Sequence, residues 1–341
     1  MLQNIERIVR VEWIAQELLQ RFETSGPLIE TIIDIFPDNV QIKEETYKPS
    51  HYLIIQGSFD PPTLSHIDLI SKAIDHRFKL DPSDKFKVIL LLSLSHVDKK
   101  INVINRSLLG YRVEMLETSF SYLKPKIPIS IGLSNVARYI DLIDATQQFS
   151  INVKKISFIM GMDVFKKLLD PYYYSKSLDQ VLPLIFRADY LIAGREDVFS
   201  REEFNIFLNE HLHHQFHKNI HFLSMPKSYR FLNATAIREK YSKKQSIQET
   251  YLHSTVKKYL EKNNIYYLTS KRIATKIAIQ LVVHLTLTAG KDQLTAIKIL
   301  EQLLPEIESD TSLQQKLISE YKIGKKGEIR KKWIQISNLI S

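Results

Sequence analysis

A phosphate-binding arrangement can be assembled from a few residues between positions 53 and 66. The apolar run 53–55 predicts a short buried strand that ends at Gly57, where the absence of a side chain lets a ligand approach the backbone. The Asp-Pro-Pro sequence at 60–62 must turn, because proline fixes its own backbone angle and steers the preceding residue away from helix. A helix that restarts after this turn places Thr63 and His66 beside its N-terminal amides. Those amides, the helix dipole and an imidazole donor predict a site for a phosphate group.

A second helix start with similar chemistry lies at 233–238. Asn233 is a good N-cap, Thr235 falls in the first turn with a free amide and a hydroxyl, and Arg238 lies one turn further on. These three residues predict a second phosphate-binding cradle. We expect the two cradles to align two phosphorylated substrates.

The segments around the first cradle follow a strand–helix–strand order. Helical apolar spacing over 64–74 is followed by a loop and by the apolar run 86–92, which predicts a second buried strand. Such units build open parallel sheets, which bind ligands beyond the carboxyl ends of their strands. The polar segment 93–105 begins at such an end, so its basic side chains are candidates for phosphate contact, a solvated charged loop being the alternative: His96, Lys99 and Lys100.

Three further apolar runs extend this pattern, at 127–133, 156–161 and 188–195, with a helix expected over 134–148. Gly161 and Asp163 stand at the end of one of these strands and Arg195 at the end of another. A strand end with an N-capping aspartate is the plainer reading of Asp163. The order of elements predicts an α/β fold with a Rossmann-like parallel sheet.

These motifs resemble those of the nucleotidyltransferase superfamily. The segment 232–238 resembles the family's second signature, Ile-Ser-x-Thr-x-x-Arg, and 109–116 resembles its Arg-x-x-Met-Leu helix. The segment 252–266 resembles the closing Val-x-x-Tyr-Ile-x-x-x-x-Leu-Tyr of the pyridine-nucleotide branch. The first signature, Gly-x-Phe-Asp-Pro-x-(His/Thr)-x-x-His, is matched by six residues: Gly57, Phe59, Asp60, Pro61, Thr63 and His66.

The chain departs from the family pattern at a few positions within the resemblance, which covers about residues 51–267. Ser65 stands where glycine is frequent, and Asn233 stands where the family has serine. Thr63 replaces the histidine of bacterial members and is similar to the eukaryotic nicotinamide mononucleotide adenylyltransferases. Neither Thr63 nor Ser65 by itself indicates an inactive site.

The resemblance implies transfer of AMP from ATP to nicotinate or nicotinamide mononucleotide, which gives a dinucleotide and pyrophosphate in NAD biosynthesis. It implies Mg²⁺ as cofactor, although no carboxylate ligand can be identified from the sequence. The catalytic residues it implies are His66, Thr63 and Arg238. Its ATP-binding residues map to Gly57, Ser58, Phe59, Asp60, Thr63, His66, Gly161, Asp163, Asn233, Thr235 and Arg238. Its second-substrate residues map to Lys99, Tyr173 and Arg195.

The acceptor ring is where the resemblance is weakest. The family places a tryptophan a few residues after Gly-x-Asp, whereas the two tryptophans of this chain, Trp13 and Trp333, lie outside the matched region. The stretch 172–174 offers three tyrosines instead, and a tyrosine can stack on a pyridine because stacking needs only a flat π face.

Other classes of protein share parts of this pattern. A class I aminoacyl-tRNA synthetase has a His-x-x-His signature, but it is longer and carries a Lys-Met-Ser-Lys-Ser loop where this chain has 233–238. A pantetheine-phosphate adenylyltransferase or a cytidylyltransferase would differ only in acceptor or base. A catalytically inert nucleotide-binding relative is a further alternative, suggested by the missing tryptophan and by Asn233.

Composition sets broad limits on location and partners. The 341 residues carry a net charge of +9 and include no cysteine, which excludes disulfides and thiolate metal sites and fits the cytoplasm. We expect no secretory signal, no membrane span and no nucleic-acid partner. Five histidines between 211 and 221 are candidates for zinc ligands, but the sequence fixes no fourth ligand. We therefore interpret this segment as a polar surface helix and strand.

The two ends of the chain lie outside the resemblance. Apolar spacing over 1–48 predicts a helical extension of two helices, followed by the nucleotidyltransferase domain at 49–267. Residues 268–341 predict a small all-helical domain that could pack on the core, bind a partner or form a homo-oligomer.

Overall fold

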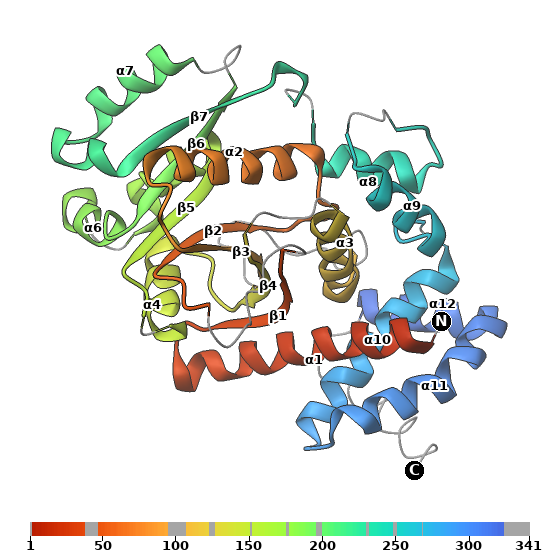
Figure 1. Cartoon of the computed structure of the whole chain (residues 1–341). Helices are drawn as coiled ribbons and strands as arrows, with labels where there is room; N and C mark the ends of the chain where they lie inside the picture. Colours follow the sequence, from red (N-terminus) through yellow and green to blue (C-terminus); the bar gives the residue numbers. More distant parts are fainter. Residues whose placement is uncertain are drawn as a thin grey trace.

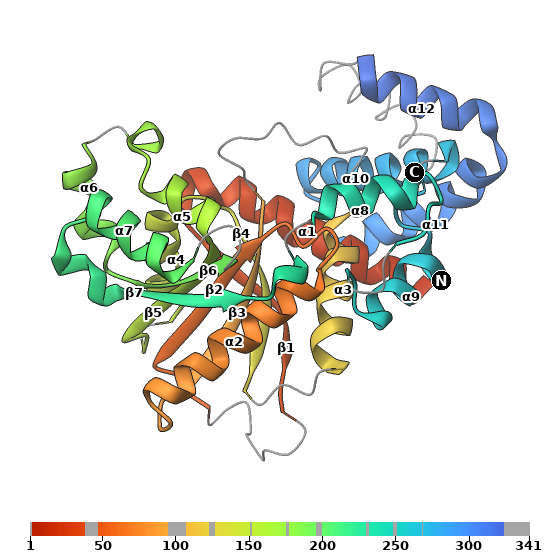
Figure 2. The same ribbon diagram turned by 90° about the horizontal axis from the view of Figure 1, so that it is seen from above.

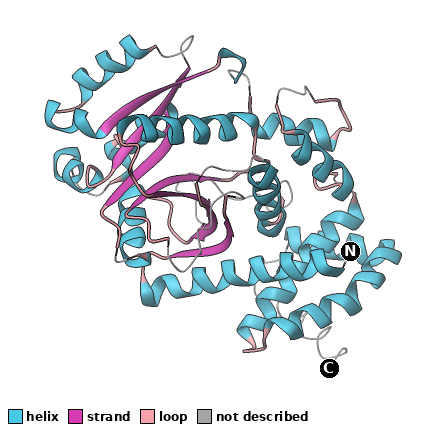
Figure 3. Ribbon diagram, viewed as in Figure 1, coloured by secondary structure: helices cyan, strands magenta, loops and turns pink. Residues whose placement is uncertain are grey.

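The computed structural model describes residues 2–37, 47–94, 107–122, 127–150, 152–174, 177–195, 200–229, 232–247, 251–267 and 269–323. A seven-stranded sheet lies at the centre, with helices around it (Figures 1 and 3). Its strands stand in the spatial order β1-β4-β3-β2-β5-β6-β7. Their bounds are β1 Ile29–Ile35, β2 His51–Gly57, β3 Phe86–Ser93, β4 Ile129–Ser134, β5 Lys155–Gly161, β6 Asp189–Arg195 and β7 Ile220–Met225.

The sheet reverses its direction of growth at β2. From β2 the chain builds β3 and then β4 on one side, and it then returns to place β5, β6 and β7 on the other side. All of these pairs are parallel, so the carboxyl ends of β2 and β5 lie at the same edge. An open α/β sheet binds its ligands at such a reversal point. The predicted Rossmann-like parallel sheet is therefore confirmed.

Two hydrophobic clusters cover the two faces of the sheet. One contains the inward side chains of α2 (Leu64–Leu80), α3 (Leu109–Tyr122) and the second half of α1 (Leu2–Ser25). The other contains those of α4 (Tyr139–Phe149), α5 (Met162–Leu168), α6 (Leu178–Ile185) and α7 (Arg201–His211). Figure 2 shows the layers from above. The strands of the interior are apolar on both faces, as parallel strands between two helix layers must be.

The segment 29–35 is a strand, so our prediction of a second N-terminal helix is wrong. β1 runs antiparallel to β4, from the pair Ile29–Ser134 to the pair Ile35–Ile129. Five of its seven residues are β-branched, which lose side-chain freedom in a helix and pack well on a pleated surface. The open edge of β4 completes its backbone hydrogen bonds, and this long-range pairing has no counterpart in local apolar spacing.

The two ends of the chain pack against each other beside the sheet. Ile8 and Val9 of α1 lie in one cluster with side chains of α10 (Ser270–Thr288), α11 (Gln293–Ser309) and α12 (Thr311–Ile323). Figures 1 and 2 both show the start of α1 next to α10. Among the described residues, no helix is long and apolar enough to cross a membrane. The C-terminal helices thus share a core with the N-terminal helix.

The contact of α1 with α3 leaves no room for a side chain at Gly110. A Cβ atom there would lie 2.6 Å from the Cα atom of Ile8. We expect Gly110→Ala to lower the free energy of unfolding by about 1–3 kcal/mol through overpacking, although alanine is the better helix former. Urea denaturation measures it, with Ser121→Ala on an exposed position of α3 as the control. A Gly110→Ala protein as stable as the wild type would place α1 elsewhere.

Candidate functional site

The first signature forms a tight corner between β2 and α2. Phe59 adopts a left-handed backbone conformation, with φ of 44°, and its ring is buried. A Cβ atom at Gly57 would lie 3.3 Å from the Phe59 ring, so glycine gives this ring its place under the strand end. The same ring meets the imidazole of His66 edge to face, with centroids 5.1 Å apart. Ser58 lies between Gly57 and Phe59 in the chain, at the edge of the sheet where β2 ends.

The imidazole of His66 is held in one tautomer. The backbone N–H of Thr63 donates to Nδ1 of His66 at 3.1 Å, and the Thr63 hydroxyl lies 2.7 Å from the same atom. Because Nδ1 accepts, the ring proton sits on Nε2. Burial lowers the pKa of His66 to about 4, so the ring is neutral at physiological pH. The site therefore holds a neutral N–H donor, and Thr63, itself buried as the N-cap of α2, acts by positioning it.

The carboxylate of Asp60 is a buried junction. It is fully shielded from solvent, and Oδ1 accepts hydrogen bonds from the hydroxyls of Ser107 and Tyr266, the latter at 2.7 Å. The guanidinium groups of Arg112 and Arg238 lie 3.8 and 3.9 Å from Oδ2. Asp60 was predicted to contact ATP, but a carboxylate with these partners holds the corner together rather than facing a ligand.

Arg238 joins the second signature to the first. Its Nη1 donates to the backbone carbonyl of Asp60, and its Nη2 donates to the Thr235 hydroxyl at 2.9 Å. Thr235 lies in the first turn of α8 (Ala234–Ser242), where its N–H donates to the side chain of the N-cap residue Asn233 at 2.8 Å. The Thr235 amide, which the sequence predicts to be free, is therefore already bonded, and Arg238 ties α8 to the turn that precedes α2.

The remaining predicted site residues follow neighbouring strands. Gly161 ends β5 and begins α5, and a Cβ atom there would lie 2.6 Å from the exposed carboxylate of Asp163. The backbone of Arg195 ends β6 at the same edge. Tyr173 lies in a 3₁₀ turn (Pro171–Tyr173) after α5 and meets Tyr172 edge to face. Lys99, with its neighbours His96 and Lys100, lies outside the described residues.

A resident metal has no built site in the part of the chain that the structure describes, where no group of three or more histidines and carboxylates is arranged to hold an ion. The histidines of 211–221 have other contacts: His211 lies against the carbonyl of Phe207, and His217 lies against that of Leu212. The Asp60 carboxylate already accepts hydrogen bonds from the hydroxyls of Ser107 and Tyr266.

A hydroxyl–imidazole–carboxylate row occurs at the opposite edge of the sheet. His51 Nε2 lies 2.8 Å from the Ser157 hydroxyl, and His51 Nδ1 lies 2.7 Å from Asp84. Ser157 is 2% exposed and His51 is 1% exposed, so no substrate can reach the hydroxyl. Burial lowers the pKa of His51 despite Asp84. This row connects strands β2 and β5 and is not a nucleophilic site.

Several residues that organise the site were not among the predicted site residues. Arg112 and Tyr266 stand inside motifs that the resemblance covers, so the motifs contained a signal for them. Ser107 and Glu12 carry none, because an isolated serine and a single acid on an amphipathic helix are ordinary surface residues by pattern alone. In the fold Glu12 is buried and accepts the backbone N–H of Leu109 at the start of α3.

Comparison with known proteins gives structural matches only. No family model and no curated protein sequence matches the chain. The fold is similar to that of the Plasmodium falciparum nicotinic acid mononucleotide adenylyltransferase complexed with APC, with 15% identity, a TM-score of 0.43, and coverage of 64% of this chain and 97% of that chain. A putative nicotinate-nucleotide adenylyltransferase from Vibrio parahaemolyticus gives 16% identity, a TM-score of 0.36 and the same coverage. Because both TM-scores are below 0.5, these matches support no conclusion about residue roles or substrate. Such conclusions rest on the geometry of this chain alone.

The hydrogen bond from Tyr266 to Asp60 spans 206 residues and can be tested alone. We expect Tyr266→Phe to lower the free energy of unfolding by about 1.5–3 kcal/mol, because it removes a buried donor to a charged acceptor. Chemical denaturation measures this loss. The adjacent Tyr267→Phe, whose ring lies below the ammonium of Lys244, should change stability by no more than about 0.5 kcal/mol. Equal effects of the two variants would contradict the assigned role of Tyr266.

Proposed function

We propose that the chain transfers the AMP group of ATP to the phosphate of a pyridine mononucleotide. The observation that carries this proposal is the direct contact of two phosphate-binding helix starts, made by Arg238 on Asp60, at the reversal point of a parallel sheet. A single phosphate needs one helix start, whereas two polyanions that react with each other need two that are held in fixed register.

The chemistry suits residues that donate hydrogen bonds rather than residues that take up protons. An oxygen of the acceptor phosphate attacks the α-phosphorus of ATP, and the bond from that phosphorus to the bridging oxygen breaks to release pyrophosphate. The attacking oxygen is already anionic, so no general base is required. The barrier falls when donors follow the charge that moves onto the bridging and nonbridging oxygens. The Nε2–H of His66 and the N–H groups of Arg238 that are not used on Asp60 and Thr235 are donors of this kind.

The neutral state of His66 fits this role. A neutral donor can strengthen its hydrogen bond as charge develops without first attracting a second proton. Its pKa of about 4 keeps that state across the physiological range. Mg²⁺, brought by the nucleotide, would supply charge neutralisation on the β- and γ-phosphates.

The identity of the acceptor is supported by the closing segment and by the strand ends. Tyr266, the last residue of the segment that resembles the pyridine-nucleotide branch, is the residue that anchors Asp60. Tyr173 lies in the segment that follows β5, and Arg195 ends β6. We propose that both residues contact the acceptor. Lys99 is proposed as a phosphate contact from the sequence alone.

The activity can be tested by release of pyrophosphate from purified protein. We expect ATP with nicotinate or nicotinamide mononucleotide to give pyrophosphate and the dinucleotide in Mg²⁺, with no product from CTP. Formation of product with pantetheine phosphate or from CTP would assign the chain to another class of nucleotidyltransferase. ATP binding without turnover of any acceptor would identify an inert nucleotide-binding relative.

The role of His66 gives a separate expectation. His66→Ala should lower kcat by roughly a hundredfold or more and change ATP affinity by only a few-fold, since its donor acts mainly on charge that develops in the transition state. Steady-state kinetics and ATP titration measure the two quantities. The control is His76→Ala on the same helix, whose ring lies against His221. An equal loss of ATP affinity and of kcat would make His66 a ground-state anchor instead.

A further inference from the structure

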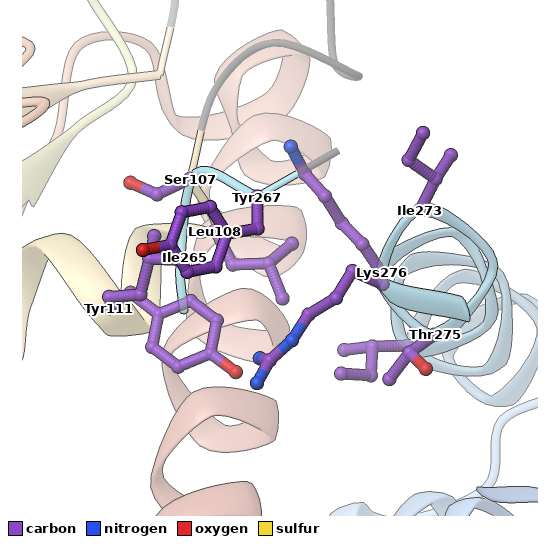
Figure 4. A pocket seen from close by; sticks show the side chains of 10 residues that line it. Ser107, Leu108, Tyr111, Ile265, Tyr267, Ile273, Thr275 and Lys276 are labelled. Atoms are coloured by element: carbon purple, nitrogen blue, oxygen red, sulfur yellow. The ribbon is translucent and has the colours of Figure 1, made fainter. Parts of the chain in front are cut away.

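A second basic pocket lies behind the corner, between α10 and the end of the closing segment. Ser107, Leu108 and Tyr111 line one side, and the other sides are formed by Ile265 and Tyr267 and by α10. Figure 4 shows Lys276 extending from α10 over the space between that helix and Tyr267. The C-terminal helices form part of its wall, so the pocket depends on the region for which the sequence indicated no role. The α10 residues that line it are Arg272, Ile273, Thr275, Lys276 and Ile279.

The polar lining of this pocket consists of cations and hydroxyls. Arg272 and Lys276 carry positive charge, and none of the described lining residues is a carboxylate. Tyr111 lines the same pocket as Arg272, and the guanidinium charge acts on its hydroxyl. Hydroxyl groups of serine, threonine and tyrosine complete the lining. The hydroxyls of Ser107 and Thr275 already donate to Asp60 and to the carbonyl of Lys271, so the donors that match the oxygens of a phosphate or sulfate group are the charged groups of Lys276 and Arg272.

The charges around Lys276 come from several elements. Asp60 and Glu12 face it with negative charge, and Arg112 and Arg238 face it with positive charge. Both carboxylates already accept hydrogen bonds, from Tyr266 and Ser107 and from the amide of Leu109 respectively. Burial lowers the pKa of Lys276 to about 8. An anion in the pocket would favour the charged ammonium and raise that pKa.

The size of the pocket limits its ligand. The cavity volume is about 50 Å³, while one water needs roughly 10–15 Å³. The space therefore holds roughly three to five water-sized groups, which is the size of one tetrahedral oxyanion and not of a nucleotide. We propose that this pocket binds a single phosphate group, separate from the nucleotide corner, between Lys276 and Arg272.

The site is tested with the full chain by calorimetric titration of inorganic phosphate. Lys276→Met should weaken one phosphate-binding event at least about tenfold, and Lys276→Arg should keep most of the affinity. Arg272→Gln should weaken the same event, and thermal unfolding shows whether each variant is folded. The matched control is Lys271→Met, since Lys271 lies on the same helix but points to Glu308 at the surface, 3.4 Å away.

The variant His66→Ala separates this site from the nucleotide corner. Phosphate binding that persists in His66→Ala and disappears in Lys276→Met supports the pocket, whether or not the chain transfers AMP. Binding lost in His66→Ala and kept in Lys276→Met places the phosphate in the corner and overturns the proposal. Equal losses in Lys276→Met and Lys271→Met show general attraction to a basic surface, which also overturns it.

Titrations with sulfate test how anion binding depends on pH, because the charge of sulfate is constant between pH 7 and 9.5. Sulfate affinity should fall as the pH rises from 7 to 9.5, since Lys276 loses its proton there, and binding at pH 8 should take up protons in the wild type and not in Lys276→Met. Pyrophosphate and free phosphate are compared in separate titrations to identify the source of the group. Sulfate binding that is unchanged over this range would contradict a role for Lys276.

Discussion

The organisation of this chain depends on one buried carboxylate. Asp60 is enclosed where the sheet reverses direction, and it draws together partners from α3, from α8 and from the closing segment. A buried charge is costly when any partner is missing, so the native arrangement is favoured over arrangements that lack one of them. The starts of α2 and α8 are thereby fixed relative to each other before any ligand arrives, which is the preorganisation that the proposed transfer between two polyanions would require.

The helices at the two ends of the chain belong to the same charged centre. Glu12 of α1 fixes the start of α3, from which Arg112 reaches Asp60, and Lys276 of α10 faces the same carboxylate. Their apolar sides share one cluster outside the sheet. Helices α1 and α10 therefore help to hold the corner in place. A ligand bound in the pocket beside α10 would contact Ser107, whose hydroxyl also donates to Asp60.

Local signals predicted strands β2 to β6, the turn at 60–62 and both helix starts, because glycine, proline and capping residues determine backbone geometry over a few positions. They did not predict β1, whose identity as a strand depends on the free edge of β4. The resemblance implied that Asp60 contacts ATP, and neither it nor the local pattern indicated that the carboxylate is fully buried. Ser107 and Lys276 could not be found at all, because each acquires its role from residues that are distant along the chain.

The packing of α1 against α10 and α11 has a consequence for synthesis on the ribosome. The apolar side chains Ile8 and Val9 emerge long before the helices that cover them, which start at Ser270. At ~5–20 residues per second, the part of this stripe that meets α10 and α11 and not α3 stays uncovered on the order of tens of seconds. The second half of α1 has its partners on the sheet much earlier. The nascent chain would thus form its sheet first and offer a short hydrophobic stripe to chaperones until the C-terminal helices close over it.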